Sequence, residues 1–325
     1  MRYKPSYKLE IPDEDNFNFC ISEIENQLSK YVHADKFTSF DNVEIYYEYY
    51  LSEESKGNFV IVHGLSEFTK KFNELIYNIL NQGYNVFIFD QRCHGLSGRL
   101  TKFVDLLHVN SFDDYVKDLE YFIDNIVLKT ENKPLYLYAH SMGGAVCSLY
   151  LAKFGNKINK TIMTAPMFEP VIDMVDPKVA RIGVSLARVL FGPKRKFALS
   201  KEFNPDVTYN EEYGLSQERF NYNMKWRREN IMYQSTPMTY GWVYNSLIIG
   251  KRILKDKIIN KINCPILIFS AEKDKTVEND IQYTFASRVS NCKIVEIKNT
   301  SHAILASDKE TLTNVFDKII SFIKD

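Results

Sequence analysis

The chain has 325 residues, of which 45% are hydrophobic and 25% are charged, so it is long enough to bury a sizeable core. Lysine and arginine together number 41, as do aspartate and glutamate, and this balance argues against a nucleic-acid partner. The five cysteines form no CxxC pair, which argues against a zinc site or a disulfide framework. The first ten residues contain no apolar segment, and no run approaches the ~18 apolar residues of a membrane span. We therefore expect a reduced, cytoplasmic protein without a signal peptide.

The first 51 residues divide into a polar extension and a strand-like region. In the extension, residues 1–35, a short helix is expected over residues 22–31. Two strand-like runs follow at residues 36–39 and 43–51, separated by the turn-forming pair Asp41-Asn42. This pattern predicts an antiparallel hairpin.

From residue 58 onward, short apolar runs alternate with segments of helical periodicity. Strands are expected at residues 58–63, 85–90, 134–139, 160–164, 265–270 and 293–298. Helices are expected at residues 72–80, 111–128, 142–153 and 312–323. Short strands that are apolar on both sides and alternate with helices predict an α/β fold, with a mostly parallel sheet covered on both faces.

The alternation stops between residues 166 and 264, where the chain is helix-rich and irregular. In such sheets, ligands bind outside the carboxyl ends of the strands, so an insertion there would act as a lid. The sequence predicts an N-terminal extension (1–35), a core (36–166 and 264–325) and a helical cap (167–263).

The strongest local motif is Tyr-Ala-His-Ser-Met-Gly-Gly-Ala at residues 138–145, which directly follows an expected strand and precedes an expected helix. A serine at this junction sits on a sharp turn that lifts its hydroxyl above the sheet. We interpret Ser141 as a nucleophile, with the N–H of Met142 stabilising a developing oxyanion. The alternative is that Ser141 only caps the helix.

A serine hydroxyl needs a base to become nucleophilic, and the base needs a partner that fixes its tautomer. In enzymes with a serine on such a turn, the acid and then the histidine follow it along the chain. Of the six histidines, only His302 follows Ser141, and it stands in the loop after the last expected strand. We therefore assign His302 as the base, against the alternative of a surface-loop histidine.

The acid should follow the preceding strand, where the sequence offers Glu272 and Asp274. We choose Asp274 because it lies deeper in the loop; the alternative role for it is to cap the next helix. The corresponding loop after residues 58–63 contains His63-Gly64-Leu65, and the N–H of Leu65 is expected to be the second oxyanion donor.

Three motifs together resemble the lysophospholipase L2 and monoacylglycerol lipase branch of the α/β-hydrolase superfamily. They are His63-Gly64, the run Asp-Gln-Arg-Cys-His-Gly-Leu-Ser at residues 90–97, and the turn around Ser141. Residues 215–220 and 236–242 resemble cap segments of the same relatives, so the resemblance extends from about residue 36 to the C-terminus. Ala139 and Cys93 depart from the pattern, which has glycine at both positions.

This resemblance implies the α/β-hydrolase fold, the triad of Ser141, Asp274 and His302, and no metal or organic cofactor. It also implies hydrolysis of a monoacyl lipid ester, a lysophospholipid or a monoacylglycerol, through an acyl-enzyme. Alternatives are a small-molecule carboxylesterase or peptidase of the same fold, or a catalytically silent binding protein. The cap aromatics expected to line an acyl groove are Trp242, Tyr240 and Phe191.

Residues 177–201 carry seven basic side chains and no acidic one, and the apolar residues of their first half fall on one helical face. Such a segment can lie on an anionic lipid surface, which would make the enzyme peripheral to the membrane. The alternative is a cap helix packed on the sheet domain with a solvated outer face.

Overall fold

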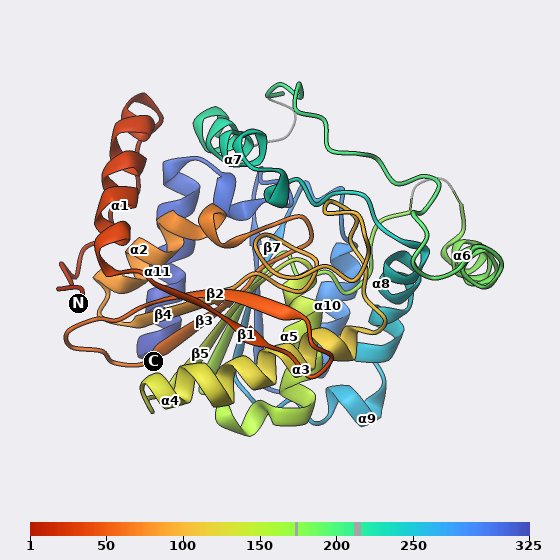
Figure 1. The fold of residues 1–325 in the computed structure, drawn as a ribbon. Helices are drawn as coiled ribbons and strands as arrows, with labels where there is room; N and C mark the ends of the chain where they lie inside the picture. Colours follow the sequence, from red (N-terminus) through yellow and green to blue (C-terminus); the bar gives the residue numbers. More distant parts are fainter. Residues whose placement is uncertain (173–174, 211–215) are drawn as a thin grey trace.

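A computed structural model describes residues 1–172, 175–210 and 216–325 (Figure 1). Its centre is an eight-stranded sheet of order β1-β2-β4-β3-β5-β6-β7-β8. The β1–β2 and β2–β4 pairs are antiparallel, and all the other pairs are parallel. The strands are β1 (His33–Thr38), β2 (Glu44–Tyr50), β3 (Asn58–Val62), β4 (Asn85–Phe89), β5 (Leu135–His140), β6 (Lys160–Thr164), β7 (Ile266–Ala271) and β8 (Cys292–Ile297).

The helices of the described residues fall both between the strands and at the two ends of the chain. They are α1 (Phe17–Tyr31), α2 (Asn73–Asn81), α3 (Phe112–Phe122), α4 (Leu128–Thr130), α5 (Met142–Phe154), α6 (Pro177–Phe191), α7 (Gln217–Glu229), α8 (Tyr240–Ile253), α9 (Asp256–Ile259), α10 (Asn279–Arg288) and α11 (Lys309–Lys324). The predicted α/β fold and the predicted β1–β2 hairpin are confirmed. Several boundaries differ from the prediction: α1 begins at Phe17 rather than at residue 22, β1 begins at His33 rather than at residue 36, and α11 begins at Lys309 rather than at residue 312. The helix expected over residues 111–128 contains a π-helical turn at Ile123–Val127.

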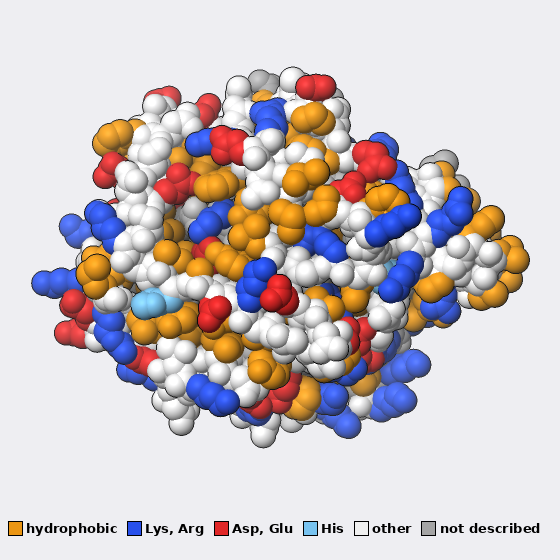
Figure 2. All heavy atoms as spheres, viewed as in Figure 1, with side chains coloured by type: hydrophobic (Ala, Val, Ile, Leu, Met, Phe, Trp, Pro, Cys, Tyr) orange, Lys and Arg blue, Asp and Glu red, His pale blue; other side chains and the backbone are white. Residues whose placement is uncertain are grey.

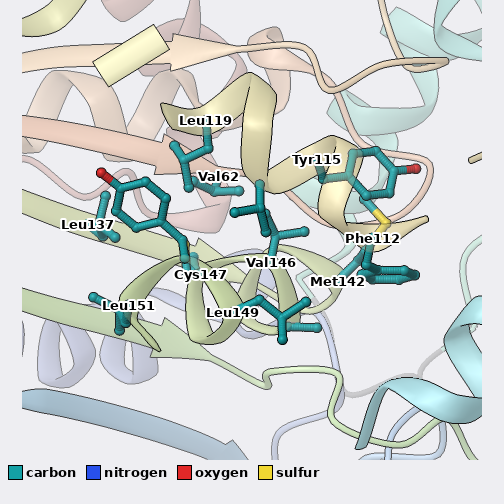
Figure 3. Packing of buried hydrophobic residues seen from close by; sticks show 14 of the residues in the cluster. Val62, Phe112, Tyr115, Leu119, Leu137, Met142, Val146, Cys147, Leu149 and Leu151 are labelled. Carbon is teal, nitrogen blue, oxygen red and sulfur yellow. The ribbon is translucent and has the colours of Figure 1, made fainter. Parts of the chain in front are cut away.

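Two hydrophobic layers enclose the sheet. On one face α3, α5, α8 and α10 pack against the strands, and on the other face α1, α2 and α11 do so (Figure 1). Every residue of the central strands β3 and β4 is buried, which explains why these strands are apolar on both sides. Figure 3 shows the first layer, where Phe112, Tyr115 and Leu119 of α3 face Met142 and Val146 of α5.

The chain between β6 and β7 contains α6 to α9. Helix α6 packs on α8, and α8 packs in turn on α5, so α8 belongs to the covering layer of the sheet. Helix α7 lies apart from these helices, near α1 and α2 (Figure 1). Leu215, the first residue of a predicted cap segment, lies outside the described residues. None of the helices in the described part of the chain has the length and apolar character needed to span a bilayer.

Candidate active site

Ser141 occupies a strained turn between β5 and α5. Its backbone has φ 50° and ψ −118°, a conformation that L-amino acids rarely adopt. Two backbone hydrogen bonds hold it there: Ser141 N donates to Thr164 O at 3.1 Å, and Met167 N donates to Ser141 O at 2.8 Å. The turn therefore fixes the hydroxyl at the carboxyl edge of the sheet.

Two glycines allow the turn to approach its neighbours closely. A Cβ atom at Gly143 would lie 2.1 Å from Val62 O, and one at Gly144 would lie 2.4 Å from Pro166 Cβ. Neither position can take a side chain without moving the backbone. Ala139, which replaces the first glycine of the motif, is fully buried in β5, so a methyl group fits there.

Cys93, the second departure from the expected pattern, has φ 64° and therefore lies in the left-handed region that favours glycine. The side chain is buried, and its Sγ accepts a hydrogen bond from Leu100 N at 3.3 Å. Glycine, the residue expected here from the resemblance, would adopt this conformation at lower backbone cost.

His302 connects Ser141 with Asp274. Its Nε2 lies 2.8 Å from Ser141 Oγ, and its Nδ1 lies 2.8 Å from Asp274 Oδ2. With the proton on Nδ1, the imidazole donates to the carboxylate and accepts the serine proton at Nε2. The structure thus brings together three residues separated by up to 161 positions in the chain, in the geometry of a nucleophile, a base and an orienting acid.

The two carboxylates of the β7–α10 loop have different surroundings. The Asp274 side chain is fully buried, and its Oδ1 accepts hydrogen bonds from Thr276 N at 2.8 Å and Val277 N at 3.0 Å. Glu272 instead bonds to Lys298 Nζ at 2.9 Å and Asn299 N at 2.8 Å. Only Asp274 of these two contacts the imidazole.

The loop after β3 lies against Ser141. A Cβ atom at Gly64 would lie 3.0 Å from the Cβ of Ser141, so the backbone leading to Leu65 is in contact with the turn. Met142 is the first residue of α5, where the backbone N–H groups have no partner within the helix. The two residues expected to donate to an oxyanion, Leu65 and Met142, thus belong to the two backbone segments that adjoin Ser141.

A buried polar cluster behind His302 was not anticipated. Glu67 Oε2 accepts a hydrogen bond from Gly64 N at 2.6 Å, and Lys71 Nζ donates to Glu67 Oε1 at 2.6 Å. His140 lies 3.8 Å from the same carboxylate, and its ring centroid is 5.1 Å from that of His302. The i,i+4 spacing of Glu67 and Lys71 was the only sequence signal for this cluster.

The electrostatics of the cluster leave Glu67 charged and His140 neutral. Burial alone would raise the pKa of the Glu67 carboxyl, but Lys71 and then His140 more than offset this and hold it well below its usual range. Burial lowers the pKa of His140 to about 4, and it lowers that of His63 to about 4 as well. His63 is a structural residue whose Nε2 accepts a hydrogen bond from Gln91 N at 2.9 Å.

The three expected substrate-binding aromatics do not form one group: Trp242 lies apart from Tyr240 and Phe191. Trp242 is buried in the main core beside Phe112, with 6.4 Å between ring centroids, which favours a structural role. Tyr240 lies between α6 and α8, where it stacks on Phe191 with centroids 5.9 Å apart. Phe191, at the end of α6, is exposed.

The described residues contain no group of three or more His, Cys, Asp or Glu side chains arranged to hold a metal ion.

Comparison with known proteins gives a family and several relatives. Residues 53–310 match the family described as serine aminopeptidase, S33 (Hydrolase_4). The chain is 28% identical over 285 residues to a probable lysophospholipase L2 of Haemophilus influenzae, with 87% of this chain and 89% of the relative covered. It is 30% identical over 142 residues to a monoglyceride lipase of Saccharomyces cerevisiae, with 41% of this chain and 44% of the relative covered.

Among solved structures, a soluble variant of the Saccharomyces cerevisiae monoglyceride lipase superposes with a TM-score of 0.71 and 18% sequence identity. The match covers 90% of this chain and 94% of that chain. At this identity the likeness establishes the fold alone.

Proposed function

The chain belongs to the serine aminopeptidase S33 family of α/β-hydrolases, and from this premise we propose that it hydrolyses the carboxylic ester of a monoacyl lipid through an acyl-enzyme on Ser141. The substrate would be a lysophospholipid or a monoacylglycerol. The observation that carries the proposal is the hydrogen-bonded line from Asp274 through His302 to Ser141. The long match to lysophospholipase L2 supports the substrate class.

The reaction follows from the positions of these groups. His302 Nε2 takes the proton of Ser141 Oγ as the oxygen attacks the ester carbonyl, and the N–H groups of Leu65 and Met142 stabilise the resulting oxyanion. The imidazolium, stabilised by Asp274, then gives the proton to the leaving glycerol oxygen, and the acyl group stays on Ser141. In the second half, His302 deprotonates a water molecule that attacks the acyl carbonyl, and the proton returns to Ser141 Oγ.

A panel of substrates distinguishes this proposal from its alternatives. We expect kcat/KM to be at least about tenfold higher for long-chain monoacylglycerol or lysophosphatidylcholine than for an acetyl ester of the same head group. The reason is that each buried methylene contributes about 0.8 kcal/mol of hydrophobic transfer free energy. An aminoacyl amide included in the panel should not be turned over.

Each contrary result points to a particular alternative. Preference for the acetyl ester would indicate a small-molecule carboxylesterase, and turnover of the amide would indicate a peptidase. If no ester were turned over and a fluorophosphonate probe failed to label the protein, the chain would be a silent ligand-binding member of the family.

We further propose that α6 attaches the enzyme to an anionic lipid surface. The side of the helix that faces inward carries Val184, which packs with Tyr240 and Leu247. The outward side is apolar rather than solvated and polar, and Figure 2 shows hydrophobic side chains gathered there with Lys and Arg beside them. Six large apolar side chains are each more than half exposed: Val179, Ile182, Leu186, Val189, Leu190 and Phe191. An exposed apolar patch of this kind marks an interaction surface, and its basic neighbours suit anionic lipid.

Replacing Lys194, Arg195 and Lys196 with glutamine should weaken binding to anionic vesicles at low salt by about tenfold or more. Each cation near such a surface contributes about 1 kcal/mol, screened within a Debye length of about 10 Å at ~0.1 M salt. Lys196 will contribute least, because it already pairs with Glu202. Turnover of a short soluble ester should barely change. Vesicle co-sedimentation run beside a soluble-ester assay measures both effects.

A matched control removes three exposed lysines from the α8–α9 region. Lys251, Lys255 and Lys257 are exposed, and their replacement with glutamine changes the net charge by the same amount. This variant should bind vesicles like the unmodified enzyme. Equal losses on lipid and soluble ester would mean that residues 194–196 are structural, and a lack of vesicle binding by the unmodified enzyme would remove the membrane role.

The cellular location and the cap follow as parts of the same proposal. All five cysteines are free, which favours a reducing compartment, and we place the enzyme in the cytoplasm at the membrane surface. Residues 167–263 would form a cap over the substrate, with Tyr240 and Phe191 as contacts for the acyl chain. A lipid ester is the partner that this arrangement requires.

A further inference from the structure

Helix α7 of the insertion is tied to the N-terminal extension by a buried arginine. The Arg219 side chain is only 3% exposed. Its Nη1 donates to Glu14 Oε1 at 2.9 Å, and its Nη2 donates to Pro12 O at 3.0 Å. Nε and Nη2 also form a two-pronged pair with Glu74 of α2, at 3.0 and 2.7 Å. A buried guanidinium needs all of these acceptors, because an unpaired charge in the interior is strongly destabilising.

The residue that caps α7 connects the extension with the segment after His302. Ser216 Oγ donates to Glu14 Oε2, and Ser216 N donates to Ala306 O at 2.7 Å. Ala306 ends the 3₁₀ turn Ile304–Ala306, and the first N–H of this turn donates to His302 O at 3.0 Å. Ser216 and the 3₁₀ turn Ile304–Ala306 therefore join Glu14 to the backbone of His302.

Further contacts are made by the first two turns of α7. Tyr222 OH donates to Glu25 Oε1 of α1 at 2.7 Å, and its ring meets Phe17 with centroids 5.9 Å apart. Asn18 Nδ2 donates to Glu218 Oε2 at 2.7 Å. In Figure 1, α1 and α7 lie on the same side of the molecule. The extension therefore supports the first two turns of α7.

The residues of the loop that precede His302 are held by the sheet domain. Lys273 N donates to Thr300 O at 2.9 Å, and Asp274 accepts from His302 itself. After His302, the chain is held by the burial of Ile304 and by the bond from α7 to Ala306. The position of the imidazole thus depends on two supports, of which one comes from the extension through α7.

We propose that Glu14 is a positioning residue for the reaction: the N-terminal extension clamps α7 through Arg219 and Ser216, and α7 fixes the segment that follows His302. The inference rests on the proposed roles of His302 and Ser141. General-base catalysis needs Nε2 within hydrogen-bonding distance of Ser141 Oγ, and displacements of about 1 Å are costly in rate. The extension is therefore part of the catalytic unit.

Glu14→Ala tests the clamp, and Asp13→Ala is its matched control. Both residues lie in the extension and lose one carboxylate, but Asp13 pairs with Lys309 of α11 at 2.8 Å, and its side chain has no hydrogen bond or ion pair with α7 in the described part of the chain. On a short soluble ester, Glu14→Ala should lower kcat about fivefold with KM unchanged, whereas Asp13→Ala should keep the kcat of the unmodified enzyme. The rate of fluorophosphonate labelling of Ser141 should fall by the same factor, because labelling uses the same base.

Further measurements separate a positioning role from a structural one. Glu14→Ala removes an acceptor of the buried Arg219 side chain, so its melting temperature should fall below that of Asp13→Ala, and kcat is compared at a temperature at which both variants are fully folded. Glu14→Gln, which keeps the side-chain size and one acceptor, should have an intermediate kcat. Backbone hydrogen exchange over residues 299–306 should be faster in Glu14→Ala than in Asp13→Ala. Equal kcat and equal exchange in the two alanine variants would overturn the proposal.

The design also distinguishes failure of the clamp from failure of the proposed function. If the unmodified protein neither hydrolyses esters nor reacts with the probe, the proposed function fails, and hydrogen exchange still decides whether Glu14 holds the His302 segment. If the unmodified protein is active and Glu14→Ala matches Asp13→Ala in every measurement, the function stands and the clamp fails.

Discussion

Replacing Ser141 with alanine should lower kcat on a short soluble ester by about 10⁶-fold, since removal of the serine from such a triad abolishes covalent catalysis. The protein should stay folded, because a single oxygen is lost and the turn is held by backbone bonds to Thr164 and Met167. Steady-state kinetics of the purified variant, with circular dichroism as a check on folding, measure both effects.

Ser148→Ala is the matched control for this variant. Ser148 lies on α5, the helix that begins directly after Ser141. It is fully buried, and its hydroxyl donates a hydrogen bond to Gly144 O at 2.8 Å. Its removal should leave activity nearly unchanged, which would show that loss of a buried hydroxyl from α5 is not itself damaging. If Ser141→Ala kept more than about a tenth of the activity, Ser141 would not be the nucleophile.

Replacing His302 with alanine should be nearly as damaging as the loss of Ser141, and the double variant should be no worse than either single variant. The two residues act as a unit, so their effects on the transition state do not add. Fluorophosphonate labelling of Ser141 should also be lost in His302→Ala, because no other histidine contacts Ser141 Oγ among the hydrogen bonds of the described residues. Additive losses in the double variant would contradict the assignment of His302 as the base.

The carboxylate partner of His302 is tested by a pair of isosteric variants. Asp274→Asn should lower kcat by about 10⁴-fold, because the amide favours the wrong imidazole tautomer. Glu272→Gln is the control from the same loop: Glu272 bonds to Lys298 and Asn299 and should be dispensable for turnover. The reverse result would mean that Glu272 is the orienting acid.

The sequence determined the fold class because the fold class follows from local patterns of apolar and polar residues. Strands such as β3 and β4 are apolar on both faces, and they alternate with helices such as α5; only a covered parallel sheet buries both kinds of element. The turn at Ser141 was predictable for a similar reason, since Gly143 and Gly144 have no side chains to block the approach of β3 and of Pro166. His302 could be chosen as the base because it is the only one of the six histidines that follows Ser141 in the chain.

The direction in which an amphipathic helix faces was decided by the tertiary structure. Periodicity places Val179, Ile182 and Leu186 on one face of α6, but an apolar face can point toward a core or away from it. In the structure, the inward side of α6 is filled by Val184 against α8, which leaves the more apolar side exposed. Which side of α6 is buried depends on the side chains that α8 presents to it, and the local sequence of α6 does not contain that information.

The supports of the active site were also decided by tertiary structure. From the sequence, Arg219 is one of several cations on a polar helix, and Glu14 belongs to a polar extension. Arg219 is buried because acceptors from Pro12, Glu14 and Glu74 surround it, and Glu14 lies 205 positions away along the chain. The sequence by itself determined which residues could carry the chemistry, because nucleophile, acid and base follow in a fixed order on short local motifs. The residues that hold them in place could be identified only after folding, because a charge is buried only where distant parts of the chain supply its partners.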